Sequence, residues 1–121
     1  YEVDSQFSAN IKNALAQGIP VGIYWFSYAL NVDGAKQEAQ KCLETIQGYN
    51  ITLPVFFDFE YDTIRYAEEQ GVTLGKTAYN DHAVAFCEAI KAAGYKAGVY
   101  YNLDYYNRFV DTSRLGNYYT W

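Results

Sequence analysis

The sequence is poor in the residues that build metal centres and nucleophilic triads. It holds one histidine, His82, and two cysteines, Cys42 and Cys87, that lie far apart. Because neither cysteine has a second cysteine or a histidine at zinc-ligand spacing, we expect no metal site and no cofactor. Both cysteines are interpreted as small buried hydrophobic residues, with a disulfide between them as the alternative. His82 falls in a helical pattern away from any nucleophile, and we expect it at the surface.

The sequence also lacks the features that mark membrane and nucleic-acid partners. No apolar run approaches the ~20 residues that a membrane span requires. The net charge is -5, and the nine Lys and Arg residues form no basic cluster, which argues against a nucleic-acid or anionic-membrane partner. The length of 121 residues allows at most one domain. No signal peptide is visible and both ends look cut, so we expect residues 1–121 to form a single, incomplete domain.

Aromatic residues, by contrast, are abundant, with 14 Tyr, 7 Phe and 2 Trp. A tyrosine has a flat apolar face and a polar tip, which suits it to the wall of a wet cleft. So many tyrosines suggest that some line such a cleft. The alternative is that they fill the core and its rim.

Amphipathic helical patterns alternate with apolar strands along the chain. Helices are predicted over 5–17, 34–47, 76–93 and 103–110, and strands over 21–28, 53–60 and 96–101. Asp33 is expected to cap the second helix, and part of the polar connection 61–75 to be helical. A turn is expected through Thr112 and Ser113, with another strand opening at Tyr118. Continuous apolar strands, buried on both faces, are typical of a parallel sheet, so the fold class is α/β.

Two carboxylates follow the apolar run Leu53-Pro54-Val55-Phe56-Phe57. Asp58 and Glu60 are two positions apart, so both side chains lie on one face of the strand. Mutual repulsion and lost hydration beside aromatic rings are expected to raise the pKa of at least one of them. A neutral acid next to an ionised one is what glycosidic bond cleavage requires. The alternative is a solvated acidic pair at the end of a strand.

The ends of the three predicted strands carry polar and aromatic residues. In a parallel α/β array these ends meet at one edge of the sheet. A cleft is therefore expected there, with Asp58 and Glu60 at its floor and tyrosines in its walls. The segments that would form it are 24–28, 58–62 and 100–102, which include Tyr61 and Asp62.

These strands resemble those of glycoside hydrolase family 25, the N-acetylmuramidase lysozymes. The resemblance lies in Pro20-Val21-Gly22-Ile23-Tyr24-Trp25-Phe26-Ser27-Tyr28-Ala29, in Leu53-Pro54-Val55-Phe56-Phe57-Asp58-Phe59-Glu60 and in Ala97-Gly98-Val99-Tyr100-Tyr101-Asn102. The lead-in from Asp4 to Pro20 is similar to the helix before the family's third strand. The match runs over essentially the whole chain, and the set of motifs in this order is fairly specific.

The resemblance implies an irregular (β/α) barrel that cleaves the β-1,4 bond between N-acetylmuramic acid and N-acetylglucosamine in peptidoglycan, outside the cell or at its wall. Glu60 matches the proposed general acid and Asp58 the supporting carboxylate. Tyr24 and Tyr100 match cleft tyrosines, and Trp121 matches the aromatic residue that opens the sixth strand. A monomer acting on glycan strands, without cofactor, is expected. Family domains extend further on both sides and carry further active-site aspartates there, so this chain would be the middle of the barrel.

Two other functions fit some of the same residues. A chitinase-like glycosidase also ends a strand in Asp-x-Glu, but such enzymes typically carry Asp-Gly and further Asp residues upstream, where this chain has only apolar residues. A non-catalytic carbohydrate-binding module would use the tyrosines to stack on sugar rings. Such a module has little reason to crowd two carboxylates into a dry strand end, because burying charge costs free energy.

Overall fold

The computed structural model describes residues 17–18, 22–49 and 51–120. They form one four-stranded sheet in the order β1-β2-β3-β4, with every neighbouring pair parallel. The strands are β1 (Ile23–Phe26), β2 (Val55–Asp58), β3 (Ala97–Tyr100) and β4 (Tyr119–Thr120). Each lies within or next to a segment predicted to be extended, so the parallel α/β class is confirmed. The predicted helix over 5–17 lies almost wholly outside the described residues.

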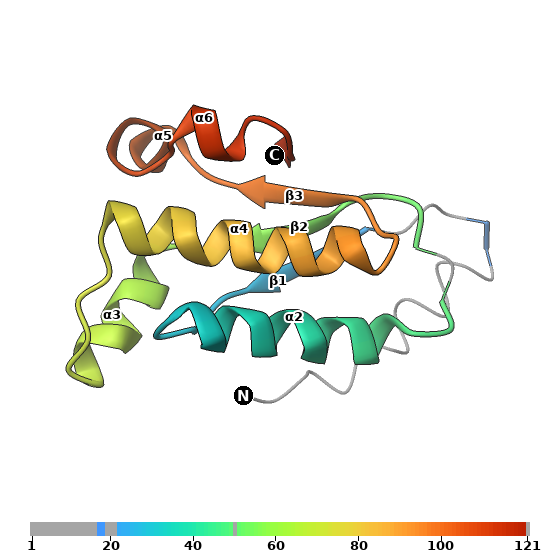
Figure 1. The fold of residues 1–121 in the computed structure, drawn as a ribbon, viewed down its shortest axis with the longest axis horizontal. Helices are drawn as coiled ribbons and strands as arrows, with labels where there is room; N and C mark the ends of the chain where they lie inside the picture. Colours follow the sequence, from blue (N-terminus) through green and yellow to red (C-terminus); the bar gives the residue numbers. More distant parts are fainter. Residues whose placement is uncertain (1–16, 19–21, 50, 121) are drawn as a thin grey trace.

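Helices connect the strands and cover one face of the sheet. Figure 1 shows the two long helices, α2 and α4, side by side across this face, with α3 at one end and α5 and α6 along one edge. Their bounds are α2 Val32–Ile46, α3 Tyr61–Glu69, α4 Lys76–Ala92, α5 Leu103–Arg108 and α6 Thr112–Leu115. The connection 61–75 is therefore partly helical, as predicted, whereas the turn predicted at Thr112 and Ser113 is the short helix α6.

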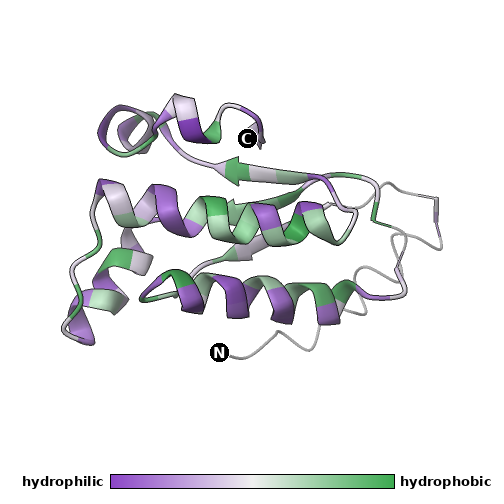
Figure 2. Ribbon diagram, viewed as in Figure 1, coloured by the Kyte–Doolittle hydropathy of each residue, from purple (hydrophilic) through white to green (hydrophobic). Residues whose placement is uncertain are grey.

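The core lies between the sheet and the pair α2 and α4. Each long helix turns a stripe of apolar residues inward, among them Ala39 and Cys42 of α2 and Phe86 of α4. Hydrophilic and hydrophobic residues accordingly alternate along both helices in Figure 2. The strand residues that meet them alternate along the chain and are almost fully buried; they are Ile23, Trp25, Val55, Phe57, Ala97 and Val99.

The opposite face of the sheet is less buried. On this second face, parallel pairing places Tyr24 beside Phe56, and places Asp58 between Phe26 of β1 and Tyr100 of β3. Tyr24 is 41% exposed and Phe26 is partly exposed. No described helix covers these residues (Figure 1). The expectation that strand 21–28 is buried on both faces is thus wrong for β1, whose side chains alternate between buried and accessible.

Helix α2 begins two residues earlier than predicted, at Val32. Its N-cap is Asn31, whose Oδ1 accepts a hydrogen bond from the Gly34 N–H at 2.7 Å. Asp33, predicted as the cap, lies in the first turn, where a negative charge still favours the helix dipole. After the helix, Gly48 adopts a φ of 88°, a left-handed conformation that glycine accepts readily and that reverses the chain toward β2.

His82 and the two cysteines are all buried. His82 is 2% exposed on α4, with its ring 6.3 Å from that of Phe59, so its predicted surface position is wrong. The surface position was predicted wrongly because α4 is apolar over much of its circumference, so its periodicity does not separate a buried from an exposed face. Cys42 and Cys87 are both free and fully buried, as interpreted from the sequence. Burial raises the pKa of both thiols to about 12, so they stay protonated and unreactive at neutral pH.

Candidate active site

Asp58 is the last residue of β2 and points to the accessible face of the sheet, yet its side chain is fully buried. Its Oδ2 accepts a hydrogen bond from the hydroxyl of Tyr24, which projects from the neighbouring strand β1. Its Oδ1 is also buried and has no hydrogen-bond partner among the described residues. Asp58 therefore sits in a dry position, with the Tyr24 hydroxyl and the Glu60 carboxyl as its polar neighbours.

This environment changes the protonation of Asp58. Burial, the largest effect, raises its pKa, the hydrogen bond from Tyr24 lowers it, and the neighbouring Glu60 carboxyl raises it again. The net result is a pKa of about 7 against an ordinary value of 3.8. Asp58 thus keeps its proton to near-neutral pH. The sequence predicted a raised pKa for at least one member of the pair, and Asp58 has a raised pKa.

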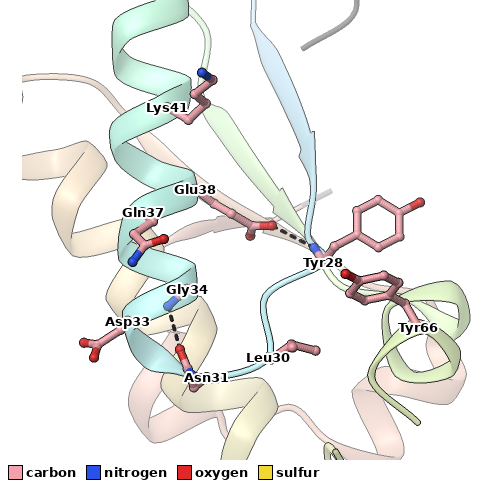
Figure 3. Close-up of a pocket in the computed structure, with 9 residues that line it drawn as sticks. All are labelled: Tyr28, Leu30, Asn31, Asp33, Gly34, Gln37, Glu38, Lys41 and Tyr66. Carbon is pink, nitrogen blue, oxygen red and sulfur yellow. Dashed lines mark hydrogen bonds between the residues drawn. The ribbon is translucent and has the colours of Figure 1, made fainter. Parts of the chain in front are cut away.

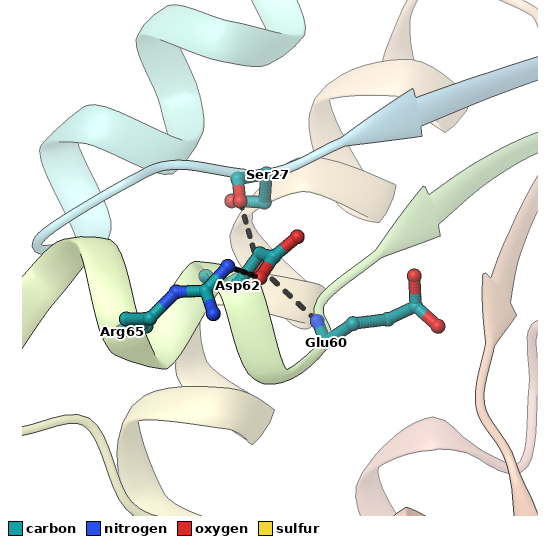
Figure 4. Close-up of polar contacts among 5 residues, drawn as sticks. Ser27, Glu60, Asp62 and Arg65 are labelled. Atoms are coloured by element: carbon teal, nitrogen blue, oxygen red, sulfur yellow. Dashed lines mark hydrogen bonds and ion pairs between the residues drawn. The ribbon is translucent and has the colours of Figure 1, made fainter.

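Glu60 lies just beyond the strand, at the N-cap of α3, with an extended backbone and a partly exposed side chain. Its N–H donates to the Thr63 hydroxyl at 3.1 Å. Figure 4 shows that the Glu60 side chain extends away from α3. Glu60 also acts on Asp58 through both charge and a side-chain contact, so the two carboxyls are neighbours, as predicted. One member of the pair is accessible and the other is enclosed.

Tyrosines from the two flanking strands lie on either side of Asp58. Tyr24 and Tyr100 are in edge-to-face contact, with ring centroids 5.7 Å apart, and Tyr100 is paired in register with Asp58. Burial and the hydrogen bond to Asp58 raise the pKa of Tyr24 above its ordinary value of 10, so its hydroxyl remains a donor. The structure therefore brings together four of the predicted site residues, Asp58, Glu60, Tyr24 and Tyr100.

The other predicted site residues stand apart from this cluster. Tyr61 is 54% exposed, and its hydroxyl donates to Asp104 of α5 at 2.5 Å. Asp62 forms an exposed ion pair with Arg65 on α3 (Figure 4). Trp121 lies outside the described residues. The helix that starts at Tyr61 explains the divergence, because successive residues of a helix no longer alternate between two faces as in a strand.

Sequence reasoning missed Thr63 and Ser27, which hold the acidic segment in place. Thr63 is fully buried, and its hydroxyl donates to the Ser27 carbonyl oxygen at 2.8 Å while accepting from the Glu60 N–H at 3.1 Å. The sequence contains a signal for this contact, since a threonine three residues after an N-cap residue is in reach of that residue's backbone N–H.

A separate cavity of about 860 Å³ opens between the N-terminal part of α2 and the end of β1. Figure 3 shows Tyr28 and Tyr66 at one side of it and polar residues of α2, among them Gln37 and Lys41, at the other. Tyr28 and Tyr66 meet edge to face, with ring centroids 5.5 Å apart. Neither Asp58 nor Glu60 lines this cavity, so it is distinct from the carboxyl cluster.

The described part of the chain contains no group of three or more His, Cys, Asp and Glu residues placed to bind a metal ion. Among the described helices, none combines the length and the apolar character that crossing a membrane demands.

The family model for glycosyl hydrolases family 25 matches residues 1–121. No curated protein matches the chain. Several solved structures match it. The structure of the CTP1L endolysin is 24% identical to this chain, with a TM-score of 0.78, and the match covers 100% of this chain and 39% of the endolysin chain.

The modular autolysin LytC from Streptococcus pneumoniae also matches, at 24% identity with a TM-score of 0.73. Its structure in complex with a synthetic peptidoglycan ligand matches at 25% identity, with a TM-score of 0.72. Each of these two covers 88% of this chain and 25% of the LytC chain. The chain thus spans less than half the length of the solved proteins it is similar to.

Proposed function

This chain belongs to the glycosyl hydrolases of family 25, and on that premise we propose that it forms the acid-bearing middle segment of a peptidoglycan hydrolase. Residues 1–121 would be one incomplete catalytic domain, with further strands on both sides. The single observation that carries the proposal is the Asp58–Glu60 pair, in which a buried carboxyl holds its proton to near-neutral pH beside an accessible one.

The proposed parent fold is a (β/α) barrel. In an open doubly wound sheet the strand order reverses and helices cover both faces. Here the order runs β1 to β4 without reversal, and α2 and α4 cover the same face. The accessible face would be the interior of the barrel and the carboxyl edge its mouth, where barrel enzymes carry their active sites. The likeness in fold to the LytC autolysin and the CTP1L endolysin supports this arrangement.

The proposed substrate is the glycan strand of peptidoglycan, cleaved between N-acetylmuramic acid and N-acetylglucosamine. Family membership supports a glycoside hydrolase, and the LytC structure with a synthetic peptidoglycan ligand supports a cell-wall glycan as its target. The enzyme would then act outside the cell or at the wall. The aromatic contact of Tyr24 with Tyr100 beside the acids offers apolar surface for a sugar ring. Tyr61, Asp62 and Trp121 remain predicted substrate contacts.

In the proposed mechanism Glu60 is the general acid. It is the accessible member of the pair, so it can reach the glycosidic oxygen, whereas Asp58 is enclosed. The proton that Asp58 keeps near neutral pH lies next to Glu60, so the pair holds one proton in common. In the reaction this proton passes from Asp58 to Glu60 and from Glu60 to the departing oxygen as the glycosidic C–O bond breaks. The negative charge that develops on the pair stabilises an oxocarbenium-like transition state, and water then adds to the anomeric carbon and returns a proton to the pair. Asp58 would be the supporting carboxylate beside Glu60 at the reacting sugar.

The test uses the full-length protein that contains this chain, incubated with purified bacterial cell walls. Hydrolysis is expected to clear the suspension and release new reducing ends. Glu60→Gln should lose at least ~100-fold in rate, since general acid catalysis contributes about 10²–10⁴-fold, while still sedimenting with the walls. Glu44→Gln, on the exposed surface of α2, is the control for a lost carboxylate.

Each alternative predicts a different outcome of the same test. A carbohydrate-binding module would sediment with the walls without clearing them. A chitinase-like enzyme would release reducing ends from chitin in preference to peptidoglycan. A near-normal rate for Glu60→Gln would refute the acid role of Glu60.

A further inference from the structure

The loop after β1 is tied to both residues of the acidic pair, Asp58 at the end of β2 and Glu60 at the start of α3. The Ser27 N–H donates to the Asp58 carbonyl oxygen at 2.7 Å and continues the parallel ladder by one step. The Ser27 carbonyl oxygen accepts from the Thr63 hydroxyl at 2.8 Å, and that hydroxyl accepts from the Glu60 N–H at 3.1 Å. A single residue of the loop therefore reaches Asp58 directly and Glu60 through one side chain.

Ser27 is itself anchored to α2. Its hydroxyl donates to Oε1 of Glu38 at 2.8 Å and accepts from the Ala29 N–H at 3.2 Å. The other oxygen of Glu38, Oε2, accepts from the Tyr28 N–H at 2.8 Å. Both Ser27 and Glu38 are buried, so these bonds are shielded from competing water. The loop is fixed to a rigid helix before it meets Thr63.

Thr63 closes the gap that the end of the ladder leaves. β2 stops at Asp58, so the backbone N–H of Glu60 has no strand partner and would otherwise be an unsatisfied donor at a helix start. The fully buried Thr63 hydroxyl accepts the hydrogen bond from the Glu60 N–H and in turn donates one to the Ser27 carbonyl oxygen. This fixes the position of the Glu60 backbone relative to β1 as well as to its own helix.

We propose that Thr63 is a positioning residue for the general acid, acting through the Glu60 backbone and held by Ser27 and Glu38. Its role rests on the proposed function, because it matters for turnover only where Glu60 donates the proton. Thr63 does not touch the substrate in this proposal. It sets the angle at which the Glu60 side chain leaves the start of α3, and proton transfer is sensitive to such placement.

The test is Thr63→Val in the full-length protein, which removes the hydroxyl and keeps the volume, measured with soluble peptidoglycan fragments. We expect kcat to fall by about 10- to 100-fold, the loss that a displacement on the order of 1 Å can cause, with KM within about two-fold because binding surfaces are unchanged. Thr63→Ser should restore kcat to within about three-fold, since it keeps the donor and acceptor. Thr45→Val is the matched control, since the Thr45 hydroxyl also donates to a carbonyl, that of Lys41, in the last turn of α2.

A kcat for Thr63→Val close to that of the wild type, or a serine variant as impaired as the valine variant, would overturn the proposal. If the valine variant fails to fold, Thr63→Ser against Thr63→Cys compares the hydroxyl with a weakly bonding thiol of similar size, and equal kcat values would overturn it. A wild type that never cleaves peptidoglycan would instead overturn the proposed function, and with it this role, so the two failures are distinguishable.

Discussion

Replacing Tyr24 by phenylalanine should make the stability of the protein more sensitive to pH. The substitution removes the hydroxyl that donates to Asp58 Oδ2 and keeps the ring that contacts Tyr100. In the folded protein the pKa of Asp58 is about 7, whereas an unfolded chain ionises its aspartates near pH 4. Because the Tyr24 hydrogen bond stabilises the ionised form, its loss raises this folded-state pKa further.

The sign follows from where the proton is bound. Between about pH 4 and pH 7 the folded state holds a proton on Asp58 that the unfolded state has released, so stability falls as pH rises through this window. At about 1.4 kcal/mol per pKa unit the fall amounts to at most roughly 4 kcal/mol. Below about pH 4 Asp58 is protonated in both the folded and the unfolded state, so the protein has the full stability that it loses as the pH rises to 7.

The cost of losing the hydroxyl should therefore depend on pH. A hydrogen bond to a charged group is worth about 1.5–3 kcal/mol and one to a neutral group about 1. Because Tyr24 is 41% exposed, the lower part of these ranges applies. We expect Tyr24→Phe to lower the free energy of unfolding by about 0.5–1 kcal/mol at pH 5 and by about 1.5–2 kcal/mol at pH 8.5.

The assay is urea unfolding of the full-length protein at both pH values. Tyr106→Phe is the control, because the Tyr106 side chain is 45% exposed and its hydroxyl has no hydrogen bond within the described part of the chain. The control should show no pH-dependent difference from the wild type. Equal destabilisation of Tyr24→Phe at the two pH values, or a larger effect at pH 5, would refute the account of Asp58.

Two further predictions concern the scaffold. Asn80→Ala should lower the free energy of unfolding by about 2–3 kcal/mol. The buried Asn80 amide donates to the Phe109 carbonyl oxygen at 2.7 Å and accepts from the Asp111 N–H at 3.0 Å, and both bonds would be lost. A loss under about 0.5 kcal/mol in urea unfolding would contradict this. Gly98→Ala should cost about 1–3 kcal/mol, because a Cβ there would approach the Phe56 ring to 2.6 Å. A Cβ at Gly75 would meet nothing within 4 Å, but Gly75 is the N-cap of α4, where glycine is preferred to alanine, so Gly75→Ala should cost only about 0.5–1 kcal/mol. Equal effects of the two would refute the packing argument.

The sequence predicted the scaffold of the site because strong local signals agreed. Apolar runs that end in polar or aromatic residues located all three longer strands, and parallel pairing then required their ends to meet. Asp58 and Glu60 two positions apart, with Tyr24 and Tyr100 on the neighbouring strands, were enough to predict the cluster. The match of the family model to residues 1–121 agrees with the resemblance that these motifs carried.

What remained unpredicted depends on contacts between distant segments. Nothing local to Asp58 says that its side chain is the enclosed one, because its burial arises from the strands on either side. The position of His82 was missed because a helix packed against both a sheet and a second helix has little exposed surface. Tyr61 and Asp62 were grouped with the pair because the strand pattern was extended past Asp58, where the chain in fact enters α3.

The burial of Asp58 is itself an argument for function over architecture. Its Oδ1 is enclosed with no described hydrogen-bond partner, and a half-satisfied buried carboxyl costs stability that an apolar residue of similar size would not. Nothing on this face of the sheet requires a polar residue at position 58, since Phe26, which is paired in register with Asp58, is apolar and only partly buried. A residue that keeps its proton near pH 7 beside an accessible glutamate is costly as a structural element and useful as a partner in proton transfer. A chemical role therefore explains the acidic residues at the carboxyl end of β2 better than the requirements of folding do.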